Sequence, residues 1–434
     1  MKIRAWHTAM VAAAVLFTFT LLGGPSPAAQ PYDAPRPAAD AATAGRSAWY
    51  TSWAQSQQGL AEEPLRNQTV RTIARLSQGG SAVRIRVQNQ FGQERLDIAH
   101  ASVAVSRDGG PAVRTGTTRE LTFSGSEQVG VPVGGEVWSD PVRLPTEAQT
   151  DLAVSLHVPG TIRPGVHGAA WRDNYLTSAD SGDHTTDADG SAFTVTTPST
   201  YLVSAVDVRS PRIRGTIVAY GSSVVDGAGS TDCGPGCTPH GTDQRWTDVL
   251  ARRVVRELPA DRQLAIANAG INGTPSAPDC PGTSDVYDGL DASARLDRDV
   301  LALHGVTGVI FFYGTNDLQN RCTSEQILDS YRKVFSRLRA AGVKVYVIPS
   351  TPRPGYTDQM NRYRWDIGTW AGHQGDCGGA CDGVIDFDQV IKDPVAPNSI
   401  SAKYDVGDGV HVNIAGHRAE AETISLRMLL SSGY

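Results

Sequence analysis

The sequence has no block of basic residues and no surplus of positive charge. Of its 434 residues, 39 are lysine or arginine and 45 are aspartate or glutamate, which gives a formal net charge of −6. Nucleic-acid-binding domains usually carry a clustered positive patch, so nucleic acid is not an expected partner. Hydrophobic residues make up 40% of the chain and charged residues 19%, a balance typical of a globular protein and not of a disordered one.

Long apolar runs are also scarce, and the one that stands out lies at the N-terminus. A positively charged start precedes an apolar stretch at residues 9–22, and small residues follow at 26–30. This order predicts an export signal over residues 1–29 that is cleaved from the mature chain. The run is short for a bilayer-spanning helix, which needs roughly 20 apolar residues, although an uncleaved anchor is the alternative. We therefore expect a secreted protein without a stable membrane anchor.

Cysteines are few and even in number. Six are present, and an even set in an exported chain predicts disulfide bonds. A zinc site built from the two C-x-x-x-C pairs is the alternative, but zinc clusters favour tighter spacing and often include histidine. Sequence does not fix the connectivity; the pairing that we favour is Cys233–Cys237, Cys280–Cys322 and Cys377–Cys381.

The first half of the chain reads as a linker followed by β structure. Residues 30–46 are rich in proline and alanine and predict an extended linker. From 47 to 210, short stretches alternate apolar and polar residues, with turn residues between them. In VRIRVQ at 83–88, Val and Ile should face one way and Arg and Gln the other. The region predicts an all-β accessory domain, a sandwich or jelly-roll-like fold.

Residues 211–434 have a different pattern, in which short apolar runs alternate with helical segments. A last helix is expected from about Asn413. Strands that are apolar throughout, separated by helices, predict a parallel sheet covered on both faces in a three-layer α/β domain. In such sheets the active site lies beyond the carboxyl ends of the strands. The expected strands are 216–221, 263–270, 308–314, 344–350 and 383–388.

Side chains suited to nucleophilic catalysis fall at these strand ends. Ser222 and Ser223 follow the first strand, and Asp408 and His411 precede the last helix. A serine hydroxyl is a weak nucleophile until a base takes its proton, and a histidine base needs a carboxylate to fix its tautomer. His411 is the best candidate base, and one turn at a helix start would bring Asp408 to it.

The tetrahedral intermediate of such a reaction needs hydrogen-bond donors aimed at its oxygen. The Ser223 amide, the Gly270 amide and the Asn316 side chain are the candidates, each at or just beyond the end of a predicted strand. A Cys280–Cys322 disulfide would tie together the two loops that carry Gly270 and Asn316. Simple stapling of the loops is the alternative explanation for that bond.

Three other residues could fill the same roles. His240 and His417 are rival bases, but neither has a carboxylate three residues before it, and His417 is expected to face solvent. Asp317 is the rival acid. Taken singly, serines and carboxylates at strand ends are more often turn or capping residues, whereas their joint occurrence favours a catalytic triad.

These motifs, taken together, resemble the SGNH, or GDSL, hydrolase family over about residues 215–434. The resemblance implies a flavodoxin-like fold with Ser223 as nucleophile, His411 as base and Asp408 as its partner. It also implies that Gly270 and Asn316 complete the oxyanion hole. Ser222 stands where the family usually has aspartate. The matching blocks are Gly221-Ser222-Ser223 with Gly227, then Gly270, Gly314-Thr315-Asn316-Asp317, and Asp408-Gly409-Val410-His411.

The resemblance implies a secreted carboxylic ester hydrolase that works through an acyl-enzyme on Ser223, with no metal or organic cofactor. The appended β region favours short acyl groups on a carbohydrate, such as an acylated polysaccharide, or a small ester, and the chain is similar to two-domain, xylan-esterase-like members. A lipase or phospholipase for longer acyl chains and a non-catalytic glycan-binding protein are the alternatives. Four tryptophans could stack on sugar rings or simply pack in the core: Trp49, Trp53, Trp138 and Trp171.

Overall fold

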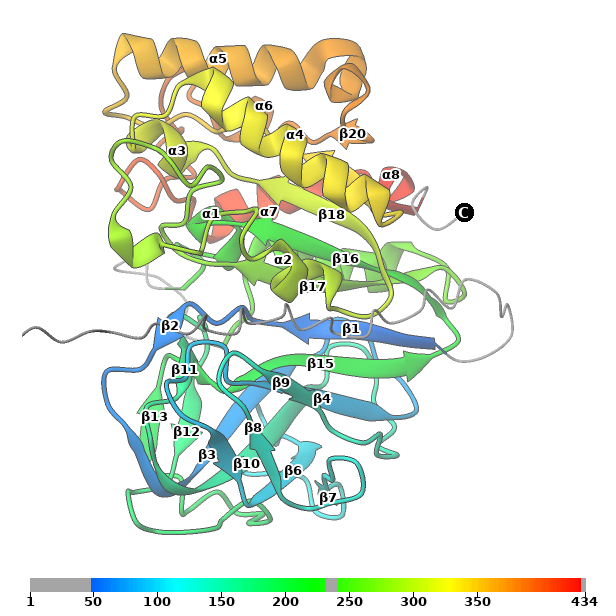
Figure 1. The fold of residues 1–434 in the computed structure, drawn as a ribbon. Coiled ribbons are helices and arrows are strands. Elements are labelled where there is room, and N and C mark those ends of the chain that lie inside the picture. The colour runs from blue at the N-terminus through cyan, green and yellow to red at the C-terminus, as the bar shows by residue number, and fades with distance from the viewer. Residues whose placement is uncertain (1–47, 232–240, 431–434) are drawn as a thin grey trace, which may run out of the picture. The chain divides into compact units, whose positions relative to one another are not determined.

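A five-stranded parallel sheet forms the C-terminal half of the chain in the computed structural model, which describes residues 48–231 and 241–430 (Figure 1). The order β17-β16-β18-β19-β20 places the first strand along the chain between the second and the third. This doubly wound arrangement has its switch point between β16 and β18. The strands are β16 (Ile213–Gly221), β17 (Gln263–Gly270), β18 (Val306–Phe312), β19 (Lys344–Val347) and β20 (Gly383–Val384).

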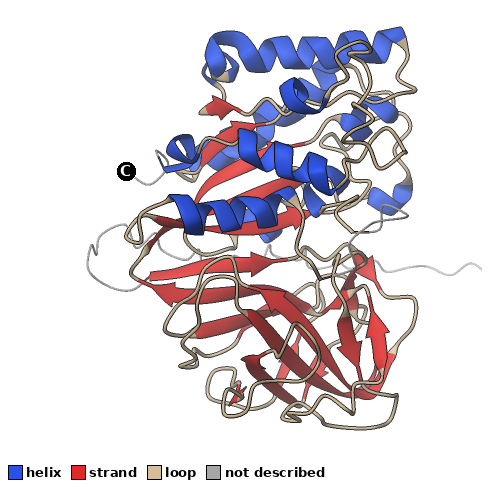
Figure 2. Cartoon of the chain, turned by 180° about the vertical axis from the view of Figure 1, so that it is seen from behind, coloured by secondary structure: helices blue, strands red, loops and turns tan. Residues whose placement is uncertain are grey.

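Helices cover both faces of this sheet, and alternate residues of each strand face opposite helical layers (Figure 2). The helices are α1 (Ser223–Asp226), α2 (Trp246–Glu257), α3 (Thr315–Gln319), α4 (Ser324–Ala340), α5 (Asp358–Gly372), α6 (Asp388–Ile391), α7 (Ile414–Thr423) and α8 (Leu426–Leu430). Val218 and Tyr220 pack in the cluster that contains α4 and α5. Ile217 and Ala219 pack in the cluster that contains α2, α7 and α8. The predicted three-layer α/β fold is therefore confirmed.

The helix ends follow local sequence signals. Thr323 precedes α4, and its hydroxyl accepts a hydrogen bond from the Gln326 amide, while the Gln326 side chain accepts one from the Thr323 amide. This reciprocal pair satisfies two donors that a helix start otherwise leaves free. Asn413 caps α7 with a single side-chain bond, accepting from the Gly416 amide at 3.0 Å, which fixes where the last helix begins.

The N-terminal half is built of antiparallel sheets. A four-stranded sheet has the order β1-β15-β4-β9, and a six-stranded sheet has the order β13-β12-β3-β10-β6-β7. Apolar side chains of both sheets share one core, with Ile85 and Val206 from the first and Val103 and Leu156 from the second. The region is thus a β-sandwich, as predicted.

The strands of this half are β1 (Ala48–Ala54), β2 (Gly59–Leu60), β3 (Leu65–Arg75), β4 (Val83–Gln88), β5 (Leu96–Ile98), β6 (His100–Val105), β7 (Arg119–Glu120), β8 (Val129–Val131), β9 (Glu136–Trp138), β10 (Asp151–Ile162), β11 (Gly165–His167), β12 (Asn174–Leu176), β13 (Val195–Thr197), β14 (Thr200–Tyr201) and β15 (Val203–Ser210).

The polar face of β4 is largely buried. Arg86 points away from the apolar core of the sandwich, as the alternation predicts, yet it is only 1% exposed. Its guanidinium donates to Ser204 Oγ at 2.8 Å and to the Arg298 carbonyl at 3.1 Å. Because Arg298 belongs to the C-terminal half, this polar face is part of the contact between the two halves.

Residues 45–434 form a single compact unit, so the division into domains at residues 210 and 211 stays a prediction. The predicted export signal and the linker, residues 1–29 and 30–46, lie outside the described residues. Within the described part, no helix is both long enough and apolar enough to cross a bilayer.

Candidate active site

The two serines at the end of β16 have different surroundings. Ser223 is the first residue of α1, and its amide donates no hydrogen bond within the described residues. Ser222 precedes the helix, is 1% exposed, and has a hydroxyl without a hydrogen-bond partner among the described residues. Of the two hydroxyls, only that of Ser223 contacts a candidate base.

That contact joins three side chains from distant parts of the chain. Ser223 Oγ lies 2.9 Å from His411 Nε2, and His411 Nδ1 lies 2.6 Å from Asp408 Oδ2. An ionised carboxylate can only accept, so the proton of the neutral ring is held on Nδ1 and Nε2 is free to accept from the serine hydroxyl. The geometry is that of a nucleophile, a base and a carboxylate that orients the base.

Asp408 and His411 meet in an irregular loop before α7, and not in a helical turn as the three-residue spacing suggested. Asp408 Oδ1 accepts from the amides of Val410 and His411 at 2.8 and 2.9 Å, which leaves Oδ2 for the imidazole. Asp405 braces the same loop, because its Oδ1 accepts from the amides of Gly407 and Gly409. Side-chain-to-backbone hydrogen bonds of this kind shape turns without helical repeats.

The electrostatics of the loop favour an ionised Asp408. Partial burial disfavours its charge, but the hydrogen bonds from the His411 amide, the His411 ring and the Val410 amide outweigh that effect and lower the pKa of Asp408. The carboxylate therefore stays charged at neutral pH, where it can stabilise the imidazolium that forms when the base takes a proton.

Of the expected oxyanion donors, the Gly270 amide is already engaged. It donates to Asn268 Oδ1 at 2.9 Å, within its own loop. The absence of a side chain at 270 serves packing, since a Cβ there would lie 2.2 Å from the Asp226 backbone nitrogen. The structure therefore gives no support to Gly270 as a donor, because its hydrogen already has an acceptor.

Asn316 and a second glycine, Gly273, are better candidates for the oxyanion donors. Asn316 is the second residue of α3, and its Nδ2 donates to the Thr274 carbonyl at 3.1 Å. Gly273 precedes Thr274 with a φ of 79°, a conformation that favours glycine. Its amide makes no hydrogen bond within the described part of the chain. Sequence reasoning missed Gly273, although the NAGING stretch contains both glycines.

The rival acid, Asp317, is committed to holding these loops together. It is fully buried and accepts at Oδ1 from the Ser276 amide, the Ser276 hydroxyl and the Ala277 amide, each at 2.8 Å. Its Oδ2 accepts from the Gly314 amide at 3.1 Å. These bonds tie the loop after β17 to the start of α3. None of these bonds brings Asp317 into contact with His411, so Asp317 does not act as the triad acid here.

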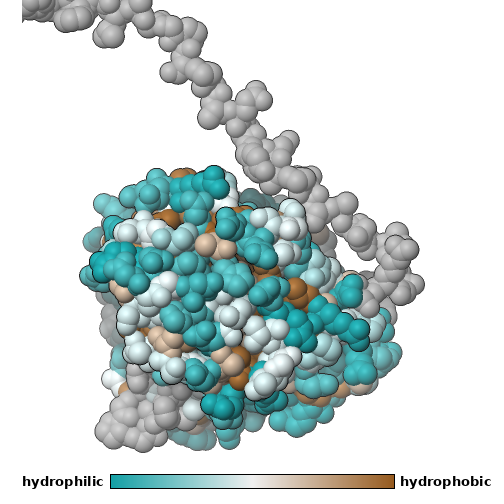
Figure 3. All heavy atoms as spheres, turned by 90° about the horizontal axis from the view of Figure 1, so that it is seen from below, coloured by the Kyte–Doolittle hydropathy of each residue, from teal (hydrophilic) through white to brown (hydrophobic). Residues whose placement is uncertain are grey.

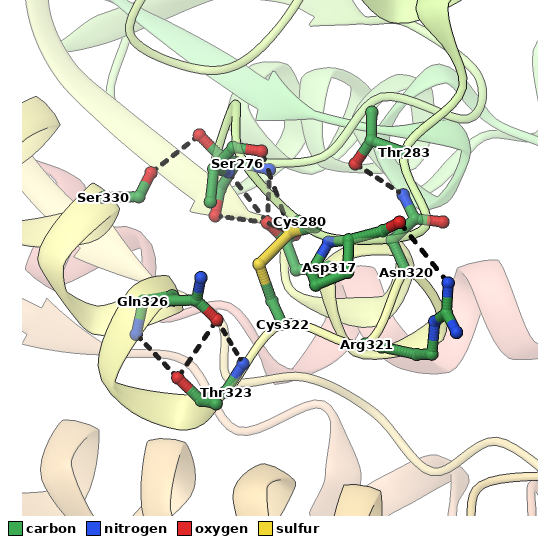
Figure 4. Close-up of a disulfide and its surroundings, with 12 residues drawn as sticks. Ser276, Cys280, Thr283, Asp317, Asn320, Arg321, Cys322, Thr323, Gln326 and Ser330 are labelled. Atoms are coloured by element: carbon green, nitrogen blue, oxygen red, sulfur yellow. Dashed lines mark hydrogen bonds between the residues drawn. A yellow bond between two sulfur atoms is a disulfide. The ribbon is translucent and has the colours of Figure 1, made fainter.

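A disulfide lies beside Asp317. Cys280 and Cys322 are bonded, and they join the loop after β17 to the segment between α3 and α4 (Figure 4). A second disulfide, Cys377–Cys381, lies between α5 and β20. The expected Cys233–Cys237 pair lies outside the described residues. Cys377 and Cys381 are joined to each other, which takes up two of the four cysteines that the zinc alternative needs.

The expectation that His417 faces solvent is wrong. It lies on α7 and is 1% exposed. Its Nε2 donates to the Ala228 carbonyl at 3.2 Å, and its Nδ1 accepts from the Trp246 amide at 3.4 Å. Burial lowers the pKa of His417 to about 4. It is thus a neutral structural residue behind the nucleophile turn. The other rival base, His240, lies outside the described residues.

Several buried side chains fix the turn that carries the nucleophile, and the sequence motifs did not single them out. Arg295 Nη2 donates to the Gly221 carbonyl at 2.7 Å. The Trp246 indole donates to the Val224 carbonyl at 2.9 Å, and Asn268 Nδ2 donates to the Val225 carbonyl at 2.7 Å. Three carbonyls near the serine are therefore held by side-chain donors from other elements. No spacing rule links such donors to the turn, so sequence patterns give no signal for them.

The tryptophans of the β region are largely used in packing. Trp53 is buried in the sandwich core. The Arg84 guanidinium lies over the rings of Trp49 and Trp138, at 4.7 and 5.0 Å from their centres. Trp171 is half-buried. The core-packing alternative describes the first three better than stacking on sugar rings does.

Residues 219–419 match the family described as GDSL-like Lipase/Acylhydrolase, a match that covers just under half of the chain. No curated protein matches the chain.

Solved structures with some likeness include a carbohydrate acetylesterase from Sinorhizobium meliloti, with 17% identity over 48% of this chain and 94% of that chain at a TM-score of 0.34. The M. smegmatis aryl esterase has 20% identity over 51% of this chain and 100% of that chain, at a TM-score of 0.35. An active-site mutant of a family two carbohydrate esterase from Clostridium thermocellum has 11% identity over 88% of this chain and 91% of that chain, at a TM-score of 0.37. Likeness this low carries nothing about substrate.

Proposed function

We propose that this chain, whose residues 219–419 form a domain of the GDSL-like lipase/acylhydrolase family, is a secreted ester hydrolase that forms an acyl-enzyme on Ser223. The observation that carries the proposal is the continuous contact from Ser223 Oγ to His411 Nε2 at 2.9 Å and from His411 Nδ1 to Asp408 Oδ2 at 2.6 Å. A hydroxyl in this setting can be deprotonated as it attacks an ester carbonyl.

The residues divide the reaction between them. Ser223 Oγ attacks the carbonyl carbon while its proton passes to His411 Nε2, and Asp408 stabilises the resulting imidazolium. His411 then protonates the leaving alcohol, which departs and leaves the acyl group on Ser223. Water enters, gives its proton to His411 and attacks the acyl group. The carboxylic acid leaves, and the proton on His411 returns to Ser223.

The oxygen of each tetrahedral intermediate needs donors. The Ser223 amide at the start of α1 and the Asn316 side chain fit this role, and we assign the third donor to the Gly273 amide in place of Gly270. The Ser223 and Gly273 amides are free of hydrogen bonds within the described residues, whereas the Gly270 amide is engaged by Asn268. Each donor of this kind typically contributes about 100- to 1,000-fold in rate.

The surface around the triad favours a short acyl group on a polar carrier. The Asp408 side chain is 46% exposed and that of His411 is 23% exposed, so a large soluble substrate can reach the site. A long acyl chain needs a contiguous apolar groove. In the described residues the large exposed hydrophobic side chains lie far apart in sequence. Figure 3, which views the molecule from the β-sandwich side, shows a face that is mainly hydrophilic with isolated hydrophobic spots. They are Val133, Val195, Val255, Val286, Trp365 and Val395.

Export of the protein is part of this proposal. The disulfides Cys280–Cys322 and Cys377–Cys381 support it, since such bonds persist in oxidising compartments and are rare in the cytosol.

The test is hydrolysis of nitrophenyl esters from acetyl to palmitoyl and release of acetate from acetylated xylan. We expect a preference for the short esters. Ser223→Ala should abolish turnover, while Ser222→Ala, its buried neighbour, serves as the matched control and should keep most activity. A peak at long acyl chains would favour the lipase alternative. Glycan binding with no hydrolysis of any ester would favour the non-catalytic one.

A further inference from the structure

His167, from the N-terminal sandwich, is buried against the turn that carries the nucleophile. It is the last residue of β11 and is 1% exposed. Its Nε2 lies 3.1 Å from Oδ1 of Asp226, the last residue of α1 and three residues beyond Ser223. Asp226 is also 1% exposed. This contact links the β region directly to the helix on which the nucleophile sits.

Both ring nitrogens of His167 face oxygen atoms that accept hydrogen bonds. Nδ1 lies 2.8 Å from the Ser56 carbonyl oxygen, and Nε2 lies 3.1 Å from the Ala169 carbonyl oxygen as well as from Asp226. A neutral imidazole has one N–H and would turn a lone pair toward a carbonyl, whereas an imidazolium donates from both nitrogens. Burial alone would lower the pKa of His167, but the Asp226 charge and the three hydrogen bonds outweigh it and raise that pKa.

The other charged groups near the turn make their hydrogen bonds elsewhere, although the Arg245 charge also interacts with that of Asp226. Arg245, on the neighbouring segment before α2, donates twice to Asp248 at 2.8 and 3.0 Å. His417, on α7, is kept neutral by burial. Asp226 Oδ2 has no hydrogen-bond partner among the described residues. In the part of the chain that the structure describes, His167 is therefore the basic side chain within hydrogen-bond distance of the Asp226 carboxylate.

The remaining anchors of this helix come from the C-terminal half. The Trp246 indole holds the Val224 carbonyl, and Asn268 holds the Val225 carbonyl. A buried carboxylate that loses its counterion is strongly unfavourable, so α1 would shift or Asp226 would take up a proton. A shift of α1 would move Ser223 relative to His411. A misplacement of about 1 Å at a reacting group can cost about 100-fold in rate.

We propose that His167 is a positioning residue for the nucleophile: a buried imidazolium, supplied by the β-sandwich, that fixes α1 through Asp226. The β region is then an integral part of the catalytic unit. This inference rests on the proposed function for its kinetic consequences, and on the geometry of the ring for the charge.

Kinetics of the full-length protein test the positioning role. His167→Gln removes the cation that is hydrogen-bonded to Asp226 and leaves the charge of Arg245, which is paired with Asp248. We expect kcat for nitrophenyl acetate to fall by roughly 10- to 100-fold with KM little changed. The double variant His167→Gln/Asp226→Asn removes both charges and should recover most of kcat. His100→Gln, which breaks an exposed histidine–aspartate contact in the six-stranded sheet, is the matched control and should behave as wild type.

A purely structural role would instead lower the melting temperature and leave kcat of the folded His167→Gln protein within about twofold of wild type, which would overturn the proposal. A double variant no more active than His167→Gln would do the same. If His167→Gln does not fold, the comparison of Asp226→Asn with wild type supplies the same kinetic test.

A readout that does not depend on activity separates this inference from the proposed function. In protein labelled with ¹⁵N-histidine, one imidazolium ring should persist at about pH 8, above the ordinary histidine pKa of about 6.5. Its signal should be absent in His167→Gln and become that of a neutral ring in Asp226→Asn. A neutral His167 in the wild type would refute the inference even in an active enzyme. A persistent imidazolium in a protein that hydrolyses no ester would refute only the function.

Discussion

Replacement of Asp408 by asparagine separates the catalytic use of this side chain from its structural use. In Asp408→Asn the amide oxygen can still accept from the amides of Val410 and His411, which Asp408 Oδ1 holds at 2.8 and 2.9 Å, so the loop should keep its shape. The new NH₂ group would then face His411 Nδ1 in place of the carboxylate oxygen that lies there at 2.6 Å. That arrangement favours the tautomer with its proton on Nε2, which cannot accept the proton of Ser223.

The size of the effect follows from the charge and its exposure. At an effective dielectric of about 20, two unit charges about 4 Å apart interact by about 4 kcal/mol. The Asp408 side chain is 46% exposed, and solvent weakens the interaction, so about 2 to 4 kcal/mol of imidazolium stabilisation should be lost. At about 1.4 kcal/mol per tenfold, kcat should fall roughly 30- to 1,000-fold. This is less than the about 10,000-fold typical of a buried aspartate.

The assay is steady-state hydrolysis of nitrophenyl acetate, together with thermal unfolding. KM and the melting temperature should change little, because an exposed ion pair contributes little to stability. Asp405→Asn is the matched control, since Asp405 braces the same loop through two backbone amides and does not contact His411. The reasoning is refuted if Asp408→Asn keeps kcat within about threefold of wild type, or if Asp405→Asn loses as much.

Two further predictions concern stability. Changing both Cys280 and Cys322 to serine should lower the free energy of unfolding by about 4 kcal/mol, because the bond closes a loop of 42 residues and loop-closure entropy grows with length. Denaturant titration measures this free energy, and a loss below about 1 kcal/mol would contradict the prediction. Burial raises the pKa of Glu420 well above its ordinary value. The Glu420 carboxyl therefore keeps its proton in the folded protein at pH values where the unfolded chain has released it. As a result, stability is lost as pH rises from about 4.5 through the folded pKa. Glu420→Gln should therefore raise the melting temperature at about pH 8 and leave it nearly unchanged at about pH 4; equal shifts at both pH values would count against a buried proton.

The positions of the reacting groups could be predicted because parallel strands bring their carboxyl ends to one edge. The strand at 263–270 was predicted to the residue, and β16 and β18 overlap the predicted runs. Once the strand order is known, Ser223 and Asn316 must follow neighbouring strands. The contact of Asp408 with His411 was also expected, although the loop that makes it is shaped by backbone hydrogen bonds to carboxylates and not by a helical repeat.

What sequence patterns left open depended on side-chain contacts that such patterns do not report. Gly270 falls at the end of a strand, as a donor should, but whether its amide is free is decided by Asn268. His417 has polar neighbours in sequence, yet the Ala228 carbonyl and the Trp246 amide enclose it. Period-two alternation correctly placed Arg86 on the face of β4 opposite the core. It did not predict that the other half of the protein would cover that face. Hydrophobic periodicity reports which side of an element is apolar, and a polar side can be buried when partners meet every donor.

Buried polar contacts also join the sandwich to the parallel sheet. If the β region only recognised a substrate, its contact with the parallel sheet could be loose and replaceable. Instead Arg86 reaches the Arg298 carbonyl, the Gln78 side chain donates to the Leu264 carbonyl at 3.1 Å, and the Thr51 amide donates to the His304 carbonyl at 3.0 Å. Buried polar contacts of this kind are costly unless all are made together. Such contacts hold the two halves of the protein in a fixed orientation. Only with a fixed orientation can a histidine from one half set the position of a serine in the other.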